Sequence, residues 1–213
     1  RAADRRVSVA GAGIFRRLIP ALRNAPEWSH QRSQGGLPTG PVACARMPRA
    51  PIDLRPARLA DATEIAAIYN REIVESTSTF DTVERTLEAQ QRWIAERSGA
   101  FSAIVAVVDG QVVGFAALSP YKERAAYRTT VENSVYVARS HHRNGIGRAL
   151  MEELIATARA SGFHSIIARI EASRDGSRAL HRACGFELVG IERQVGRKFN
   201  RWLDVAVLQL LLP

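Results

Sequence analysis

One short stretch of the sequence carries the residue types of a phosphate-binding turn. Residues 141–147 read HHRNGIG and precede a segment in which Leu150, Met151 and Leu154 recur with helical spacing. Gly145 and Gly147 let the backbone run close to a ligand, and the first turn of a helix leaves N–H groups without partners in the helix. Such a turn favours phosphate oxygens. It lacks both the GxGxxG spacing of dinucleotide sites and the GxxxxGK[ST] spacing of nucleoside triphosphate sites.

Three further blocks accompany the turn: residues 127–137 (YRTTVENSVYV), 177–186 (SRALHRACGF) and 196–205 (GRKFNRWLDV). Together they resemble the GCN5-related N-acetyltransferase (GNAT) superfamily, in its phosphinothricin and methionine sulfoximine acetyltransferase branch. The resemblance runs from about Ile52 to Leu212. It implies an α/β domain of the GNAT (acyl-CoA N-acyltransferase) fold, in which helices flank a central mixed, mostly antiparallel sheet.

The same resemblance implies the reaction and its participants. The acetyl group of acetyl-CoA would pass directly, in a ternary complex, to the primary amine of a small amino-acid analogue of the phosphinothricin, methionine sulfoximine or methionine sulfone type. No metal is implied. A protein or peptide N-acetyltransferase of the same fold is the first alternative, because it differs only in having an open groove in place of a closed pocket.

Two residues are the predicted catalytic groups. Acetyl transfer from a thioester needs a base for the amine and a proton for the departing thiolate. The resemblance implies Glu132 as the base, and a carboxylate among β-branched apolar neighbours is expected to have a raised pKa. From the residues alone, an ordinary solvent-facing strand glutamate is the commoner case, and only the family resemblance favours Glu132 as the base. His181 stands where this branch has a histidine that acts as the acid, and a structural histidine packed under the last strands is the alternative.

The predicted coenzyme contacts fall on the strand after Glu132 and on the glycine turn. The resemblance implies that main-chain groups of Val135, Tyr136 and Val137 bind the pantetheine arm and that one N–H polarises the thioester carbonyl. The pyrophosphate would be held by His142, Arg143, Asn144, Gly145, Ile146 and Gly147. His142 departs from the Arg or Gln usual in the family, so pyrophosphate affinity is expected to depend on pH. Arg174 replaces a usual Asn, and an arginine there is still a suitable phosphate ligand.

The acceptor site is predicted from a basic loop, residues 119–130 (SPYKERAAYRTT), that leads into the strand of Glu132. An anionic or polar tetrahedral side chain needs cationic donors. The candidate substrate-binding residues are Arg124, Tyr127, Arg128 and Glu132, with Phe80, in the segment 76–80, on the opposite wall. The resemblance further implies a homodimer, with Phe199 and Trp202 at its interface.

The apolar patterns predict the elements that must position these residues. Asp61 and Glu64 form a predicted capping box ahead of a helix with Ile65, Ile68, Tyr69 and Ile73 on one face. An Asp109-Gly110 hairpin turn joins two strands, and Gly162 closes the helix after the glycine turn. Strands are expected near 52–54 and over 104–108, 112–118, 129–137, 165–170, 186–192 and 202–212, and further helices over 87–97 and 176–183.

Charge divides the 213 residues into two parts. The chain has a formal charge of +9, yet residues 1–50 hold nine Arg against two acidic residues, whereas residues 51–213 hold 21 basic against 19 acidic residues. We therefore predict a basic, Gly/Pro/Arg-rich, disordered extension over 1–50, with a natural start near Met47, and the acetyltransferase domain over 51–213. A nucleic-acid or membrane-surface binding module driven by this segment is the alternative of a different class.

Compartment and partners follow from cysteine usage and hydropathy. Cys44 and Cys184 lie in unlike contexts without CxxC spacing, so neither a disulfide framework nor a zinc site is indicated. A reducing, cytoplasmic location fits this usage. No apolar run reaches the roughly 20 residues of a membrane span. We expect a small-molecule substrate as partner, and neither nucleic acid nor membrane.

Overall fold

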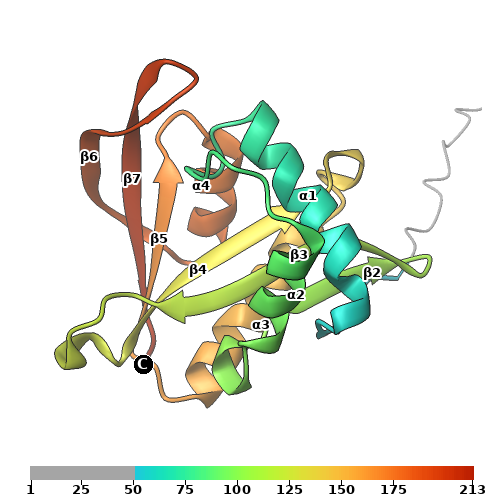
Figure 1. Cartoon of the computed structure of the whole chain (residues 1–213). Helices are drawn as coiled ribbons and strands as arrows, with labels where there is room; N and C mark the ends of the chain where they lie inside the picture. The colour runs from blue at the N-terminus through green and yellow to red at the C-terminus, as the bar shows by residue number, and fades with distance from the viewer. Residues whose placement is uncertain (1–50) are drawn as a thin grey trace, which may run out of the picture. The chain divides into compact units, whose positions relative to one another are not determined.

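A computed structural model describes residues 51–213, which form a seven-stranded sheet with helices on both faces (Figure 1). The strand order is β1-β2-β3-β4-β5-β7-β6, and β4–β5 is the parallel pair among antiparallel ones. The predicted mixed, mostly antiparallel sheet is confirmed. The strands are β1 (Asp53–Pro56), β2 (Ile104–Val108), β3 (Gln111–Pro120), β4 (Thr130–Val137), β5 (Ser165–Glu171), β6 (Glu187–Lys198) and β7 (Arg201–Leu211).

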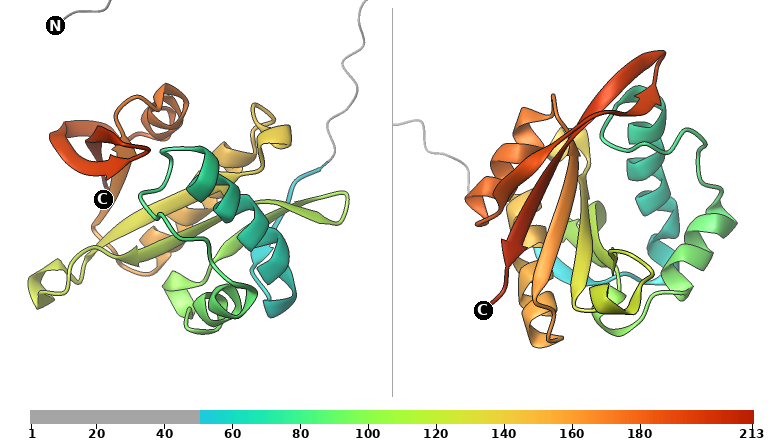
Figure 2. Two further views of the ribbon diagram at one scale, coloured as in Figure 1. Left: turned by 45° about the horizontal axis from the view of Figure 1, so that its top comes forward. Right: turned by 90° about the vertical axis from the view of Figure 1, so that its left-hand side faces the viewer.

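The helices divide into two layers. Seen along the sheet, α1 (Ala62–Glu75) and α2 (Leu87–Ala95) cover one face, and α3 (Ile146–Ala160) and α4 (Asp175–Ala183) cover the other (Figure 2, right). On the α1 face, Ile65, Tyr69 and Ile73 pack against strand residues such as Phe115. On the α3 face, the predicted apolar stripe is buried against the opposite pleat of the sheet: Leu150, Met151, Leu154, Ile155 and Ala158. Strands β2 and β3 contribute buried side chains to both cores, so their alternation separates the two.

Turns account for most element boundaries. Asp109 and Gly110 join β2 to β3 with φ of 50° and 78°, as the hairpin signal predicts. Gly162 follows α3 with φ of 74°. The last hairpin differs from the prediction, since β6 runs on to Lys198. Its register shifts between Leu188 and Gly190 and again between Glu192 and Gly196, which breaks the alternation that would reveal a strand in the sequence.

The predicted capping box at the start of α1 is wrong. The carboxylate of Asp61 accepts two hydrogen bonds from Arg55, at 2.7 and 2.8 Å, and one from the backbone N–H of Arg58 at 2.7 Å. It makes no bond to the first turn of α1. Glu64 reaches across to the N–H of Val112 at 3.4 Å. The bonds from Arg55 hold the pKa of Asp61 below its ordinary value, because they stabilise the charged carboxylate. Asp61 does not cap α1, because a charge-assisted bidentate pair is stronger than a bond to a neutral backbone N–H.

The predictions for residues 1–50 and Cys44 lie outside the described residues. Over residues 51–213, no helix combines the length and the apolar character needed to cross a membrane.

Candidate active site

The site forms where β4 and β5 separate. The two strands pair at only three positions, from Thr130 opposite Ser165 to Glu132 opposite Ile167. Beyond Glu132, β4 stays with β3 and β5 stays with β7, so the facing edges of β4 and β5 diverge. A pocket of about 1200 Å³ opens there, lined by both strands, α4, the turn before α3 and the loop after α1. An unpaired strand edge offers backbone groups to a ligand that carries amides.

The α3 side of the pocket is built from glycine and main chain. Gly145 is the N-cap of α3 with φ of +86°, and Arg143 before it also has a positive φ of 61°. A Cβ on Gly147 would lie 3.2 Å from the Leu180 side chain, so the absence of a side chain lets α3 begin close against α4. The first-turn N–H groups of α3 are thereby left at the pocket, as an anion site requires.

The predicted coenzyme residues gather at this wall with one exception. Asn144 does not line the pocket; those that do are Val135, Tyr136, Val137, His142, Arg143, Gly145, Ile146, Gly147 and Arg174. The Tyr136 side chain turns to the α1 face and stacks on Phe115, with ring centroids 5.2 Å apart. Burial raises the pKa of Tyr136, which keeps its phenol neutral. Tyr136 is among the residues that line the pocket.

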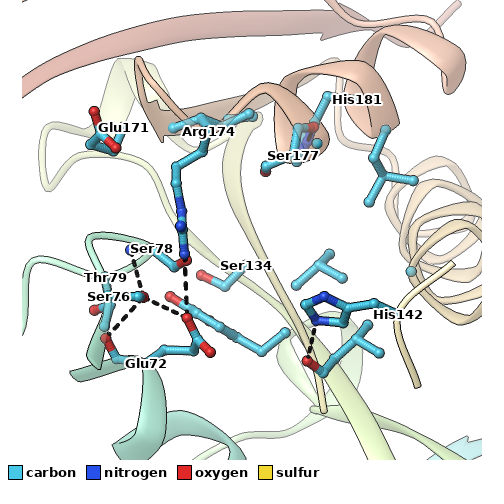
Figure 3. A pocket seen from close by; sticks show the side chains of 18 of the residues that line it. Glu72, Ser76, Ser78, Thr79, Ser134, His142, Glu171, Arg174, Ser177 and His181 are labelled. Carbon is cyan, nitrogen blue, oxygen red and sulfur yellow. Dashed lines mark hydrogen bonds and ion pairs between the residues drawn. The ribbon is translucent and has the colours of Figure 1, made fainter. Parts of the chain in front are cut away.

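His142 ties the turn to the end of β4. Its Nε2 lies 2.9 Å from the main-chain oxygen of Val137 (Figure 3). Because a carbonyl oxygen only accepts, Nε2 carries the proton and donates. A neutral ring can supply that proton, so this contact does not require a charged His142. A pH-dependent contact with pyrophosphate stays a prediction.

Glu132 lies on the α1 face of β4. Its neighbours in sequence, Val131 and Asn133, point to the α3 face, and its partner across β3 is Ser119. Burial raises the pKa of Glu132, as expected from its apolar neighbours; Arg169 opposes the rise and Glu192 adds to it. The group thus combines access to the pocket with the basicity needed to accept a proton from an amine.

His181 and Asn133 form a buried pair on the other face of β4. The Nδ1 of His181 lies 2.8 Å from the backbone oxygen of Ser177 and therefore donates to it. Burial lowers the pKa of His181, so its ring is neutral and Nε2 accepts a hydrogen bond from Asn133 Nδ2 at 3.0 Å. Asn133 is one of the residues that line the pocket, but its Oδ1 is buried from solvent and has no hydrogen-bond partner within residues 51–213. These contacts favour the structural interpretation of His181, and its role as an acid stays a prediction.

The α1 side of the pocket is a loop fastened by side chains from several elements. Thr77 donates to Glu171 of β5 at 2.8 Å, and Lys198 of β6 donates to the main-chain oxygen of Thr79 at 2.7 Å. Arg174, at the start of α4, reaches Ser78 at 3.0 Å (Figure 3). The partners are 94 to 119 residues apart in the chain, so no local pattern in the sequence predicts them.

Glu72, which the sequence did not single out, connects this wall to the end of β4 and the start of α4. Its carboxylate pairs with Arg139, just after β4, at 2.8 Å and with Arg174 at 3.4 Å, and it accepts from Ser76. Burial alone would raise the pKa of Glu72, but the bonds from Arg139 and Ser76 outweigh burial and lower it. Phe80 packs on β6, where a Cβ on Gly196 would lie 2.0 Å from its ring.

Three predicted substrate residues lie elsewhere. Arg124, Tyr127 and Arg128 are exposed in the loop between β3 and β4 and do not line the pocket. Tyr127 packs edge-on against Tyr121, and Lys122 lies 4.7 and 5.2 Å from the two ring centroids. A contact of this loop with an acceptor stays a prediction. Among residues 51–213, no group of three or more His, Cys, Asp or Glu side chains is arranged to hold a metal.

Comparison with known proteins decides the family. Residues 54–207 match the family described as the Acetyltransferase (GNAT) domain. The chain belongs to the GNAT acetyltransferase family. As the resemblance implied, it has the GNAT fold and is an acetyl-CoA-dependent N-acetyltransferase.

Relatives and solved structures support this membership over nearly their full lengths. The chain is 38% identical over 161 residues to the L-methionine sulfoximine/L-methionine sulfone acetyltransferase of Pseudomonas paraeruginosa. The aligned region covers 75% of this chain and 94% of the relative. A phosphinothricin acetyltransferase from Sinorhizobium meliloti, solved with acetyl-CoA, matches with a TM-score of 0.73 and 36% identity, covering 76% and 88%. A ribosomal-protein-alanine N-acetyltransferase from Brucella melitensis matches with a TM-score of 0.74 and 40% identity. The match covers 75% of this chain and 99% of the Brucella chain.

Proposed function

We propose that this enzyme moves the acetyl group of acetyl-CoA to the α-amine of a small amino-acid analogue of the methionine sulfoximine, methionine sulfone or phosphinothricin type. The observation that carries the proposal is the opening between β4 and β5, because it has a backbone and glycine wall on one side and a basic carboxylate, Glu132, on the other. The names of the Pseudomonas and Sinorhizobium proteins supply the acceptor class.

The residues of the α3 side fit acetyl-CoA, which when bound supplies the thioester. The N–H groups at the start of α3 would hold the pyrophosphate beside Gly145 and Gly147. The open edge of β4 after Glu132 would pair with the amides of the pantetheine arm.

In the proposed reaction, Glu132 accepts a proton from the acceptor's ammonium group, directly or through water. The freed amine attacks the thioester carbonyl, so that a C–N bond forms and the C–S bond breaks. A main-chain N–H of β4 near Val135 would stabilise the charge on the carbonyl oxygen. The departing thiolate takes up a proton from solvent, and the new amide nitrogen releases its second proton to solvent. Glu132 then passes its own proton to solvent, which restores the carboxylate, so that one proton is released overall.

His181 would act in this scheme through Asn133. A neutral ring that donates to Ser177 and accepts from Asn133 has no proton on Nε2 to give. It would fix the orientation of the Asn133 amide on β4. Protonation of the thiolate by His181 would require the ring first to gain a proton and the Asn133 amide to turn, so solvent is the simpler donor.

The acceptor would occupy the α1 side of the pocket, between Glu132 and the loop that carries Phe80. We keep Arg124, Tyr127 and Arg128 as candidate contacts for the polar end of the acceptor, since their loop leads directly into the strand of Glu132. The positive charges of Arg124 and Arg128 and the hydroxyl of Tyr127 suit the oxygens of a sulfoximine, sulfone or phosphinate group.

We also propose a homodimer. The β6–β7 hairpin exposes several large apolar side chains, including Val189, Ile191, Val195, Phe199 and Trp202, which are 43 to 62% exposed. An apolar patch of this kind is typical of an interface. Light scattering of the full chain would give the molar mass, and Trp202→Arg would shift a dimer toward the monomer; a monomeric wild type would contradict the proposal.

A substrate panel tests the function. Thiol release from acetyl-CoA is measured with methionine sulfoximine, methionine sulfone and phosphinothricin, and with a peptide that begins with alanine. The Brucella protein's name makes the peptide the relevant competitor. We expect kcat/KM for at least one amino-acid analogue to exceed that for the peptide by more than about tenfold. Turnover of the peptide alone would contradict the proposal and favour a protein acetyltransferase.

A further inference from the structure

Arg169 lines the pocket, but it is not among the predicted site residues and has no part in the proposed reaction. It lies on β5, two residues after Ile167, the register partner of Glu132. Ala168 and Ile170 on either side of it are buried in the α3-side core. Alternation along the strand therefore directs Arg169 to the α1 face, the face of Glu132, and it lines the same pocket.

The Arg169 guanidinium is held in place and still has donors to spare. One nitrogen donates to Glu192 of β6 at 2.5 Å, and within residues 51–213 this is its hydrogen-bond partner. A guanidinium has five N–H donors in a fixed plane, so the remaining edge can donate hydrogen bonds to a second carboxylate. Its side chain is 40% exposed, which leaves that edge accessible from the pocket.

We propose that Arg169 binds the free α-carboxylate of the acceptor while Glu132 faces its amine, so that the enzyme selects free amino acids over their amides, esters and peptides. An amino acid carries its ammonium and carboxylate on one carbon. Glu132 and Arg169 lie on the same face of two adjacent strands. The carboxylate of Glu132 can face the ammonium group of the acceptor, and the guanidinium of Arg169 can face its carboxylate. This inference rests on the proposed function and makes the α-carboxylate part of the recognised structure.

The pairing with Glu192 is the natural competitor to this role. An exposed ion pair between β5 and β6 adds little to stability, and Arg169 could serve only that purpose. The two roles differ in what they change. A structural pair affects unfolding and treats all acceptors alike, whereas a carboxylate ligand affects KM for acids and spares their amides.

The experiment compares methionine sulfone with its α-carboxamide at saturating acetyl-CoA, in the wild type and in Arg169→Gln, Arg169→Lys and Arg193→Gln. Arg193 is the matched control, because it is an exposed arginine on β6 outside the pocket. We expect the wild type to favour the acid by about tenfold to a hundredfold in kcat/KM, the usual effect of a charged hydrogen-bonded pair.

Arg169→Gln should raise KM for the acid by about that factor and leave KM for the amide and for acetyl-CoA within about twofold. Arg169→Lys should recover part of the discrimination, and Arg193→Gln should retain all of it. The charged groups that act on Glu132 are Arg169 and Glu192, and its β3 partner Ser119 is neutral. Arg169 lowers the pKa of Glu132, so its loss should raise that pKa and move the acid limb of the kcat/KM profile to higher pH.

Equal discrimination between acid and amide in the wild type and in Arg169→Gln would overturn the inference while the proposed function stands. Failure of the wild type to acetylate any amino-acid analogue would overturn the proposed function itself. Thermal unfolding of each variant identifies a folding defect, and Arg169→Lys keeps the test decisive if Arg169→Gln is unstable.

Discussion

The two walls of the pocket are built in different ways. The α3 wall consists of one strand edge and one turn, residues 133–147, in which main chain and glycine do most of the work. The α1 wall is a loop, residues 76–80, secured by side chains from β5, α4 and β6. A wall made of backbone presents the same groups whatever the side chains are, which suits a constant coenzyme. A wall made of side chains can vary with the acceptor.

This contrast predicts that changes on the α1 side alter acceptor kinetics, whereas changes on the α3 side alter coenzyme binding. Glu132, where the two sides meet, should give the largest effect. We expect Glu132→Gln to lower kcat by about 10² to 10⁴-fold, the usual contribution of a general base, with KM for acetyl-CoA nearly unchanged.

The pH dependence of kcat/KM tests whether Glu132 is the base. Burial raises the pKa of Glu132 above its ordinary value. The active form is the carboxylate, so wild-type kcat/KM should rise with pH and level off above that raised pKa. Glu132→Gln should lose this limb, and Glu84→Gln, outside the pocket, should keep it. A limb that persists in Glu132→Gln would assign the base to another group.

Gly145→Ala should give a smaller effect, confined to the coenzyme side. A φ of +86° is unfavourable for any residue with a Cβ. After the gain from a less flexible unfolded chain, we expect the free energy of unfolding to fall by about 1 kcal/mol. KM for acetyl-CoA should rise several-fold with KM for the acceptor unchanged.

Gly190→Ala is the control for this change, since an added Cβ there meets nothing within 4 Å and its φ is not positive. Denaturant unfolding and coenzyme titration measure both effects. If Gly145→Ala raised KM for the acceptor instead, the division of the pocket into two walls would be incorrect.

Gly196→Ala should give the smallest effect, on the acceptor side. The new Cβ would lie 2.0 Å from the Phe80 ring, so the ring must leave its place on β6. We expect KM for the acceptor to rise a few-fold with KM for acetyl-CoA constant. In a double-mutant cycle, Gly196→Ala should cost far less stability on a Phe80→Ala background. Equal costs on both backgrounds would mean that Phe80 does not pack on Gly196.

The sequence predicted most of the elements because their apolar periods are regular. The α3 stripe and the Asp109-Gly110 hairpin are local patterns, and both are confirmed. The capping box failed because Arg55, six residues before Asp61, took the carboxylate. The end of β6 was missed because its bulges interrupt the alternation. In each failure, a partner or a distortion outside the local pattern decided the outcome.

The candidate site divides in the same manner. The glycine turn and Glu132 were found from contiguous residues and from family resemblance, and all but Asn144 of the predicted coenzyme residues line the pocket. Glu72 and Arg169 were not found, because each takes its meaning from residues distant in the chain. Arg174 is predicted to contact the coenzyme, and in the structure it binds Ser78 of the loop over residues 76–80.

The sequence alone determined the family, most of the helices and strands, and the turn whose positive φ requires glycine, since these depend on motifs and periods within contiguous residues. Only the tertiary structure decided where β4 leaves β5 and which charges then share a face. The physical reason lies in sheet pairing: β5 is held along its length by β7 and touches β4 at three residues. That register sets the opening, the burial of Glu132 and the place of Arg169 beside it.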